Sequence, residues 1–190
     1  MDTPVVVVLE LARALEELGI TYAVVGSLAS SFHGRYRASG DIDVLADVRS
    51  TDVRGLKARL ETDFYADDLM MREAIAHRSK FNVIHFDSVF KVDVFIPNAS
   101  GFDVNQLKRR VQARLAPDLE QPIYLTSAED TILAKLVWYR KGNEVSELQW
   151  RDVIGVLGTA AVKLDSDYLH SWADSLGVAD LLQRALAEST

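Results

Sequence analysis

Three aspartates have the residue type and the spacing that metal-assisted chemistry needs. A single residue separates Asp41 from Asp43 in an apolar segment, and Asp93 lies in a second apolar segment further along the chain. Successive side chains of a strand point to opposite faces of a sheet, so Asp41 and Asp43 share one face. Because aspartate is disfavoured in strands, its repeated presence here indicates a function.

The chemistry that these carboxylates suggest is the binding of divalent metal ions. Carboxylate oxygens are hard ligands of the kind that Mg²⁺ and Mn²⁺ prefer. Two such ions about 3.5–4 Å apart can hold both the attacking and the leaving oxygen of a phosphoryl displacement. We therefore expect Asp41, Asp43 and Asp93 to bind two Mg²⁺ or Mn²⁺ ions. The alternative is that they are exposed aspartates that serve only solubility.

A Gly-Ser step precedes these aspartates and is suited to binding phosphate. Gly26 and Ser27 stand where an apolar strand gives way to a helix, and a helix N-terminus offers free N–H donors to a nucleoside triphosphate. Arg37 follows in the loop before the first aspartate, where we expect it to contact the nucleotide. Lys91 shares a strand face with Asp93, so it pairs either with that carboxylate or with phosphate.

Hydrophobic periodicity divides the chain into an α/β part and a helical part. We expect helices over residues 6–18, 27–33, 51–60, 67–77, 104–109, 127–141, 146–158, 166–176 and 178–188, and strands over 21–25, 41–46, 81–86, 90–96, 111–115 and 123–125. Asp87-Ser88 would join two of these strands in a hairpin. The predicted organisation is an α/β domain over residues 1–125 and a helical region over 126–190 that packs on it.

Composition limits the classes of partner and the location. The 190 residues carry a net charge of −7, which argues against a long nucleic-acid groove. We interpret the basic clusters Arg35/Arg37 and 108–110 with Arg114 as solvated charges, with phosphate contact as the alternative, which we take for Arg37. No apolar run has the roughly 18–20 residues of a membrane helix, and residues 5–9 are too short a run for a signal peptide. With no cysteine in the chain, we expect a cytoplasmic protein that does not bind membranes.

Over residues 20–96 the chain resembles the DNA polymerase β-type nucleotidyltransferase superfamily. The resemblance rests on Gly26, Ser27, Asp41, Asp43 and Asp93. It implies a mixed, mostly antiparallel sheet with helices on one face, and a nucleotide bound on the open face. It also implies that the first two aspartates bind both metals, while the third holds the catalytic metal and aids deprotonation of an acceptor hydroxyl.

The helical part is similar to AbiE-type toxin nucleotidyltransferases and their stand-alone relatives. This resemblance rests on polar residues that fall on two successive expected helices, namely Glu129-Asp130, Lys135, Arg140 and Arg151-Asp152. It implies that Lys135 contacts the triphosphate and that Asp152 positions or activates a partner in the reaction. The alternative is that Lys135 faces solvent and that Arg151 and Asp152 form a local ion pair.

Taken together, these patterns predict an enzyme that transfers a nucleoside monophosphate from a nucleoside triphosphate to a hydroxyl group. The acceptor would be an RNA end such as that of tRNA, or a protein, and the chain would be a toxin-antitoxin component with an antitoxin partner. One alternative is a small-molecule transferase of the aminoglycoside-modifying type. Another is a non-catalytic nucleotide-binding or antitoxin-like module, against which the presence of all three aspartates argues.

Overall fold

The computed structural model describes residues 3–98, 101–115, 121–159 and 163–189, and the chain divides into two units. Unit 1 comprises residues 1–24 and Ser39–Leu125, and unit 2 comprises Val25–Ala38 and residues 126–190. The second part of unit 2 begins after residue 125, where we expect the helical region to start.

Unit 1 is built on a seven-stranded sheet in the order β3-β4-β5-β2-β1-β7-β6. Its elements are α1 (Thr3–Glu17), β1 (Tyr22–Val25), β2 (Ile42–Ala46), α3 (Val53–Leu60), β3 (Phe64–Ala66), α4 (Asp68–His77), β4 (Lys80–His85), β5 (Lys91–Phe95), α5 (Phe102–Lys108), β6 (Val111–Ala113) and β7 (Ile123–Leu125). The pairs β1–β7 and β2–β5 are parallel, whereas β3–β4, β4–β5 and β6–β7 are antiparallel. The expected mixed sheet with mostly antiparallel pairing is confirmed.

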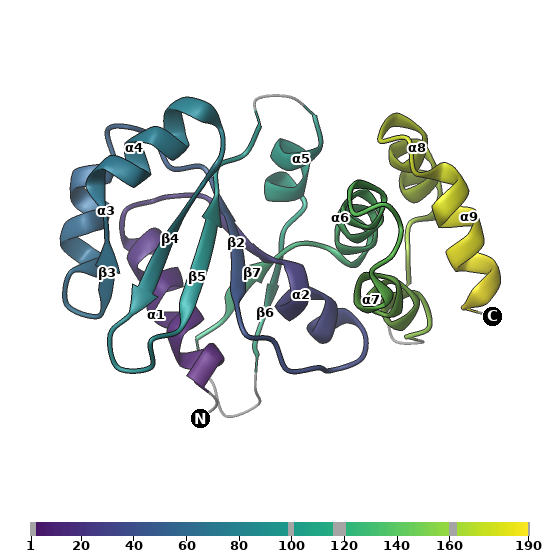
Figure 1. Cartoon of the computed structure of the whole chain (residues 1–190), viewed down its shortest axis with the longest axis horizontal. Coiled ribbons are helices and arrows are strands. Elements are labelled where there is room, and N and C mark those ends of the chain that lie inside the picture. The colour runs from purple at the N-terminus through teal and green to yellow at the C-terminus, as the bar shows by residue number, and fades with distance from the viewer. Residues whose placement is uncertain (1–2, 99–100, 116–120, 160–162, 190) are drawn as a thin grey trace. The chain divides into compact units, whose positions relative to one another are not determined.

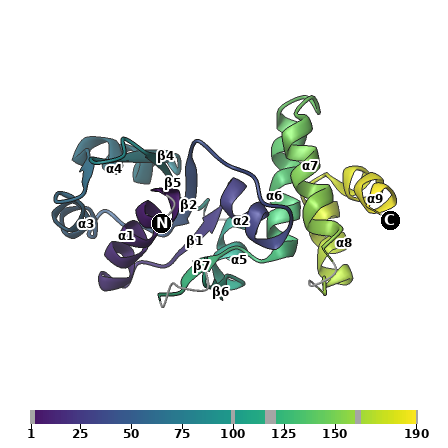
Figure 2. The same cartoon turned by 90° about the horizontal axis from the view of Figure 1, so that it is seen from below.

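Helices cover one side of this sheet, as expected. Figures 1 and 2 both show α1, α3 and α4 on the same side of the strands. The helix α1 directs Val7, Leu11 and Leu15 into the core, and β2 and β5 contribute Ile42 and Val92, all of them at most 1% exposed. Each fully buried side chain of this size contributes about 1.5–3 kcal/mol to stability. This apolar layer therefore holds the strands that carry the aspartates.

The hairpin predicted around Asp87-Ser88 is confirmed as β4 and β5. The turn between them is closed by backbone hydrogen bonds between His85 and both Phe90 and Val89. The short strand β3, which pairs with β4, is absent from the expected elements. The hairpin sets the register of Asp93, which its strand carries into the middle of the sheet.

Unit 2 is helical. It contains α2 (Gly26–His33), α6 (Ala128–Lys141), α7 (Glu147–Leu157), α8 (Ser166–Ser175) and α9 (Ala179–Glu188). Ser127 caps α6, because its side chain accepts a hydrogen bond from the Asp130 amide. Among the described residues, no helix combines the length and the apolar character that crossing a bilayer requires.

One segment lies in a different unit from the one that the sequence predicts. Residues 25–38, expected in the domain over residues 1–125, belong to unit 2 because α2 packs against α6 and α7. The approach is close: a Cβ on Gly34 would lie 2.7 Å from the backbone carbonyl carbon of Gly155. Two glycines placed 121 residues apart give no local pattern that would predict this packing.

Candidate active site

In unit 1, three neighbouring strands place polar side chains in one row across the sheet. Asp43 on β2 is in register with Asp93 on β5, and Asp93 is in register with Asn82 on β4. Residues in register point to the same face of a sheet, so the three side chains lie side by side. The alternate positions, Val44 and Val92, are buried on the opposite face. Strand alternation therefore produces the row.

Asp93 is the buried member of this row, with 3% of its surface exposed. Its Oδ2 accepts hydrogen bonds from Lys80 Nζ at 2.5 Å and from Lys91 Nζ at 3.3 Å. Burial by itself raises the pKa of Asp93, but the hydrogen bonds from the two ammonium groups outweigh it, so the pKa lies below its usual value. Asp93 is therefore ionised at neutral pH, and Lys91 pairs with the carboxylate with which we expect it to share a face.

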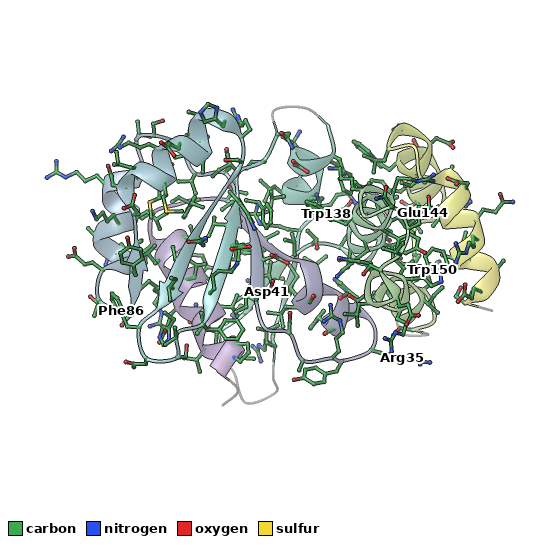
Figure 3. All side chains as sticks on the ribbon, viewed as in Figure 1. Arg35, Asp41, Phe86, Trp138, Glu144 and Trp150 are labelled. Carbon is green, nitrogen blue, oxygen red and sulfur yellow. The ribbon has the colours of Figure 1, made fainter. Side chains whose placement is uncertain are left out.

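Asp41 takes a different position from the other two aspartates. It precedes β2, which begins at Ile42 rather than at the expected residue 41, and it is exposed (Figure 3). Its Oδ1 accepts a hydrogen bond from Ser39 Oγ at 3.0 Å. Within the described part of the chain, no three carboxylate or imidazole side chains lie close enough together to hold a metal ion. The structure thus brings Asp43 and Asp93 together and leaves Asp41 just before the first residue of β2.

The donors at this row fit a divalent cation. Asp43 and Asp93 offer carboxylate oxygens from adjacent registered positions, and hard oxygens of this kind are what Mg²⁺ and Mn²⁺ prefer. The buried Oδ1 of Asp93 lies 3.1 Å from Lys91 Nζ but accepts no well-aligned hydrogen bond. The positive charge at this point comes from Lys80 and Lys91, whose side chains are 48% and 45% exposed. A bound cation would neutralise the Asp93 carboxylate in place of the two half-exposed lysine side chains.

In unit 2, the Gly-Ser step forms the start of α2. Gly26 has a φ of +65°, in the left-handed region where a side chain is disfavoured, so glycine suits the turn into the helix. The preceding residue, Val25, has no side-chain group that caps the first amides of α2. The first helical amides are thus not occupied by a side-chain cap, as a phosphate-binding helix start requires.

Ser27 belongs to a chain of polar contacts that crosses unit 2. Arg37 donates a hydrogen bond from Nη2 to Ser27 Oγ at 2.6 Å. It also donates two hydrogen bonds to Asp152, at 2.9 Å to Oδ1 and 3.1 Å to Oδ2. On its other side Asp152 accepts from Lys135 Nζ at 2.7 Å. Four of the residues singled out in the sequence therefore meet in one network.

The electrostatics of this network resemble those of Asp93, but its cations are less exposed than the two lysines on Asp93. Burial raises the pKa of Asp152, yet the hydrogen bonds from Arg37 and Lys135 outweigh it and leave the pKa below its usual value. The side chains of Asp152 and Lys135 are each 6% exposed, and that of Arg37 is 29% exposed. A paired, bidentate guanidinium in such a place holds a fixed orientation.

The structure excludes a solvent-facing Lys135 and pairs Asp152 with residues other than Arg151, while the roles of Lys135 and Asp152 in the reaction stay predictions. Lys135 does not face solvent, and Asp152 pairs with Lys135 and Arg37, whereas Arg151 is exposed. The Arg37–Asp152 pair joins residues 115 positions apart, so no local signal in the sequence indicates it. Sequence reasoning also missed Asn82, although the alternation of its strand places it on the polar face.

Comparison with known proteins finds relatives by structure alone. No family model matches the sequence, and no curated protein matches it at a significant level. An antigenic nucleotidyltransferase-like protein from Paracoccidioides brasiliensis matches with a TM-score of 0.58 and 19% identity, over 96% of this chain and 91% of that one. The solution structure of the antibiotic-resistance factor ANT(2'')-Ia matches with a TM-score of 0.52 and 14% identity, over 99% and 92% of the two chains.

A crystal structure of ANT(2'')-Ia in complex with adenylyl-2''-tobramycin gives a similar result, with a TM-score of 0.50 and 14% identity over 99% of this chain and 97% of that one. At such low identity the likeness concerns the arrangement of the backbone, and the similarity to AbiE-type toxins stays a prediction. The chain has the fold of these nucleotidyltransferase-like proteins.

Proposed function

We propose that the protein is a metal-dependent nucleotidyltransferase that moves a nucleoside monophosphate from a nucleoside triphosphate to a hydroxyl acceptor. The observation that carries the proposal is the registered pair of Asp43 and Asp93 on adjacent parallel strands of a nucleotidyltransferase-like fold. Two carboxylates so placed repel each other unless cations lie beside them. The lysines on Asp93 indicate that this position attracts positive charge.

Asp43 and Asp93 would hold Mg²⁺ or Mn²⁺. Asp41, which directly precedes β2, would be a further ligand. When bound, the metal supplies charge neutralisation for phosphoryl oxygens and lowers the pKa of a hydroxyl that it contacts. The lowered pKa of Asp93 keeps this carboxylate ionised at neutral pH. It is therefore in the form that can orient an acceptor hydroxyl and take up its proton.

The triphosphate would be bound by the start of α2 together with nearby cations. Gly26 and Ser27 offer backbone and hydroxyl donors, and Arg37 offers a guanidinium already aimed at Ser27. Because Lys135 is buried against Asp152, we assign it a positioning role through Asp152 and Arg37 rather than direct contact with the triphosphate.

The acceptor is a separate part of the proposal. The resemblance of the helical region to AbiE-type proteins favours an RNA end, such as that of tRNA, or a protein, with an antitoxin as the partner. A second candidate is a small polycationic acceptor. It is favoured by the net charge of −7 and by the fold shared with ANT(2'')-Ia, which was crystallised with adenylyl-2''-tobramycin.

One set of reactions tests the activity and separates the acceptors. The protein is incubated with each labelled nucleoside triphosphate and Mg²⁺ or Mn²⁺, and with tRNA, a protein mixture or aminoglycosides. We expect metal-dependent label on one class of acceptor, abolished in Asp43→Asn and retained in Asp87→Asn. Asp87 makes a fair control because it is an exposed aspartate in the β4–β5 turn.

A binding measurement separates the enzyme from a non-catalytic module. Calorimetry with a non-hydrolysable triphosphate should show binding that needs Mg²⁺ and that weakens in Asp43→Asn. If the triphosphate does not bind with or without metal, the protein is a module that has kept the fold. If it binds but no acceptor is labelled and Asp43→Asn binds equally well, the assignment of the carboxylates is wrong.

A further inference from the structure

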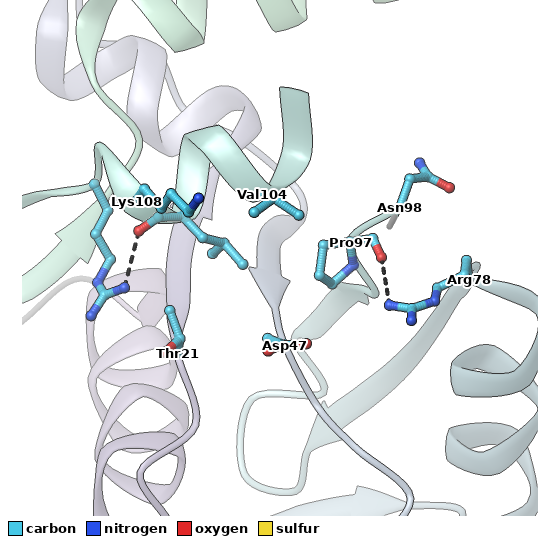
Figure 4. A pocket seen from close by; sticks show the side chains of 9 residues that line it. Thr21, Asp47, Arg78, Pro97, Asn98, Val104 and Lys108 are labelled. Carbon is cyan, nitrogen blue, oxygen red and sulfur yellow. Dashed lines mark hydrogen bonds between the residues drawn. The ribbon is translucent and has the colours of Figure 1, made fainter. Parts of the chain in front are cut away.

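Unit 1 contains a pocket of about 310 Å³ that the proposed transfer reaction does not use. It lies where several strands and helices begin or end: Thr21 precedes β1, Asp47 follows β2, Pro97 follows β5, and Val104 lies in α5. Figure 4 shows these side chains around the pocket. The carboxylate row, by contrast, lies within the strands β2 and β5.

Positive charge from two separate segments lines this pocket. Arg78 lies at the end of α4, while Lys108 and Arg110 lie at and just beyond the end of α5. The single carboxylate of the lining belongs to Asp47, which also has Arg49 within 3.6 Å. The lining therefore carries an excess of two positive charges in a chain whose net charge is −7.

Among the described residues, no carboxylate pairs with any of the three cations. Arg78 donates to the Pro97 carbonyl oxygen at 3.0 Å, and Arg110 donates to the Leu107 carbonyl oxygen at 3.0 Å. The buried Nε of Arg110 has no hydrogen-bond partner in the described part of the chain. Other surface arginines do find carboxylates, as Arg72 does with Asp68 at 2.9 Å. The pocket thus keeps hydrogen-bond donors and positive charge available for an anion.

The rest of the lining is apolar. Pro97 and Leu107 are buried, and Val104 is half-buried between them and solvent. Such a wall takes an apolar or aromatic group, whereas the cations beside it take an anionic group. Thr21 and Asn98 add polar groups at the same pocket.

We propose that this pocket binds a small molecule that carries a phosphoryl group next to an apolar or aromatic part. Phosphate has three terminal oxygens and about two negative charges, so it can accept from several donors that converge from different directions. The arginines supply directed donors and Lys108 supplies a compact charge. The site is distinct from the carboxylate row, and its occupation needs no divalent metal.

The test uses a ligand that no nucleotide site would prefer. Phenyl phosphate, inorganic phosphate and phenol are titrated separately into the full chain in buffer with EDTA, and backbone amide shifts are followed by NMR. We expect saturable shifts at Asn98, Lys108 and Arg110 with phenyl phosphate, weaker binding of inorganic phosphate, and none of phenol. Added NaCl should weaken the binding, because the contact is between charges.

Variants decide whether the pocket is responsible. Arg78→Gln with Lys108→Gln should bind phenyl phosphate about tenfold more weakly, since two charge contacts are lost. Val104→Trp should abolish binding by filling the pocket, without any change of charge. Arg54→Gln with Lys57→Gln on α3 removes the same charge from exposed positions elsewhere in unit 1 and should bind as the unchanged chain does.

The proposal is overturned if shifts map elsewhere, or if both the charge variant and Val104→Trp bind with unchanged affinity. It is also overturned if phenol binds as well as phenyl phosphate, because the phosphoryl group would then have no role. Since EDTA excludes divalent metal, these results stand whether or not the nucleotidyl transfer proposed above is found.

Discussion

Two buried aspartates, one in each unit, are each neutralised by two cations that differ in their exposure to solvent. Asp93 in unit 1 lies between two lysines whose side chains are about half exposed, whereas Asp152 in unit 2 lies between a buried lysine and a largely buried arginine. In both cases the hydrogen bonds lower the pKa against the effect of burial. The two sites thus have a similar charge balance but differ in the exposure of their cations to solvent.

The difference in the exposure of their cations indicates different roles for Asp93 and Asp152. A half-exposed lysine can swing into water at little cost, because surface ion pairs are worth only about 0–1 kcal/mol. Removing one partner from a buried ion pair costs about 3–5 kcal/mol, since it leaves a charge without compensation. The cations on Asp93 can therefore be exchanged for another cation, while those on Asp152 hold the segment with Ser27 and Arg37 against α6 and α7.

The largest expected effect is on activity. Asp93→Asn should lower nucleotidyl transfer about a thousandfold, because it removes a charge that acts directly on the reacting groups. Its free energy of unfolding should change by less than about 1 kcal/mol, since its two partner lysines are about half exposed and solvent screens them. Asp152→Asn should instead raise the KM for the triphosphate, because Arg37 loses a charged anchor. Steady-state kinetics and urea unfolding of the two variants measure both effects.

Equal losses of activity in the two variants, with unchanged stability, would show that Asp152 also acts on the reacting groups. Asp93 and Asp152 would then not differ in their roles.

The next largest effect concerns stability. Lys135→Met should lower the free energy of unfolding by about 3 kcal/mol, because Asp152 would keep its burial and lose one of two cations. Lys80→Met should change it by no more than about 0.5 kcal/mol. Urea denaturation followed by circular dichroism compares the two directly. A loss in Lys80→Met as large as that in Lys135→Met would mean that the lysines of unit 1 are as firmly held as those of unit 2.

Strand alternation predicts that Asp43 and Asp93 lie on the polar faces of their strands, but not the register that places them side by side. The one-residue spacing of Asp41 and Asp43, and the apolar residues flanking Asp93, are sequence features that indicate the shared face. The hairpin and the start of unit 2's long helix also follow from local signals, namely a turn dipeptide and the Ser127 cap. Signals contained within about ten residues of the chain therefore predict the local structure correctly.

Contacts between distant segments are beyond the reach of such patterns. The pairing of Arg37 with Asp152 and the backbone contact of Gly34 with Gly155 depend on how α2 packs against the C-terminal helices. No periodicity records that packing, so the sequence leaves open a solvent-facing Lys135 that its burial excludes. The position of Asp41 likewise depends on where β2 begins, and strand ends are poorly specified by alternation.

Acid should affect the two aspartates unequally. Because the folded-state pKa of Asp152 lies below its usual value of 3.8, its pairing stabilises the protein above that pH, and the stabilisation is lost as the pH falls through the folded-state pKa. Each unit of lowering corresponds to about 1.4 kcal/mol. Urea midpoints measured from pH 5 downward should therefore fall less steeply in Asp152→Asn than in the unchanged chain. Asp93→Asn should follow the unchanged chain more closely, because solvent screens its lysines.

The smallest effect tests whether the cations on Asp93 can be exchanged. Lys80 Nζ lies 2.5 Å from Asp93 Oδ2, so a divalent ion that uses this oxygen must displace it or share it. Lys80→Gln should therefore bind Mn²⁺ about fivefold more tightly in the absence of nucleotide, the size expected for one charge contact in water. Titration calorimetry measures the affinity, with Lys57→Gln as the control for overall charge. An unchanged or weaker affinity in Lys80→Gln alone would show that the metal does not use Asp93, and the lysines would then be the cations that neutralise this carboxylate.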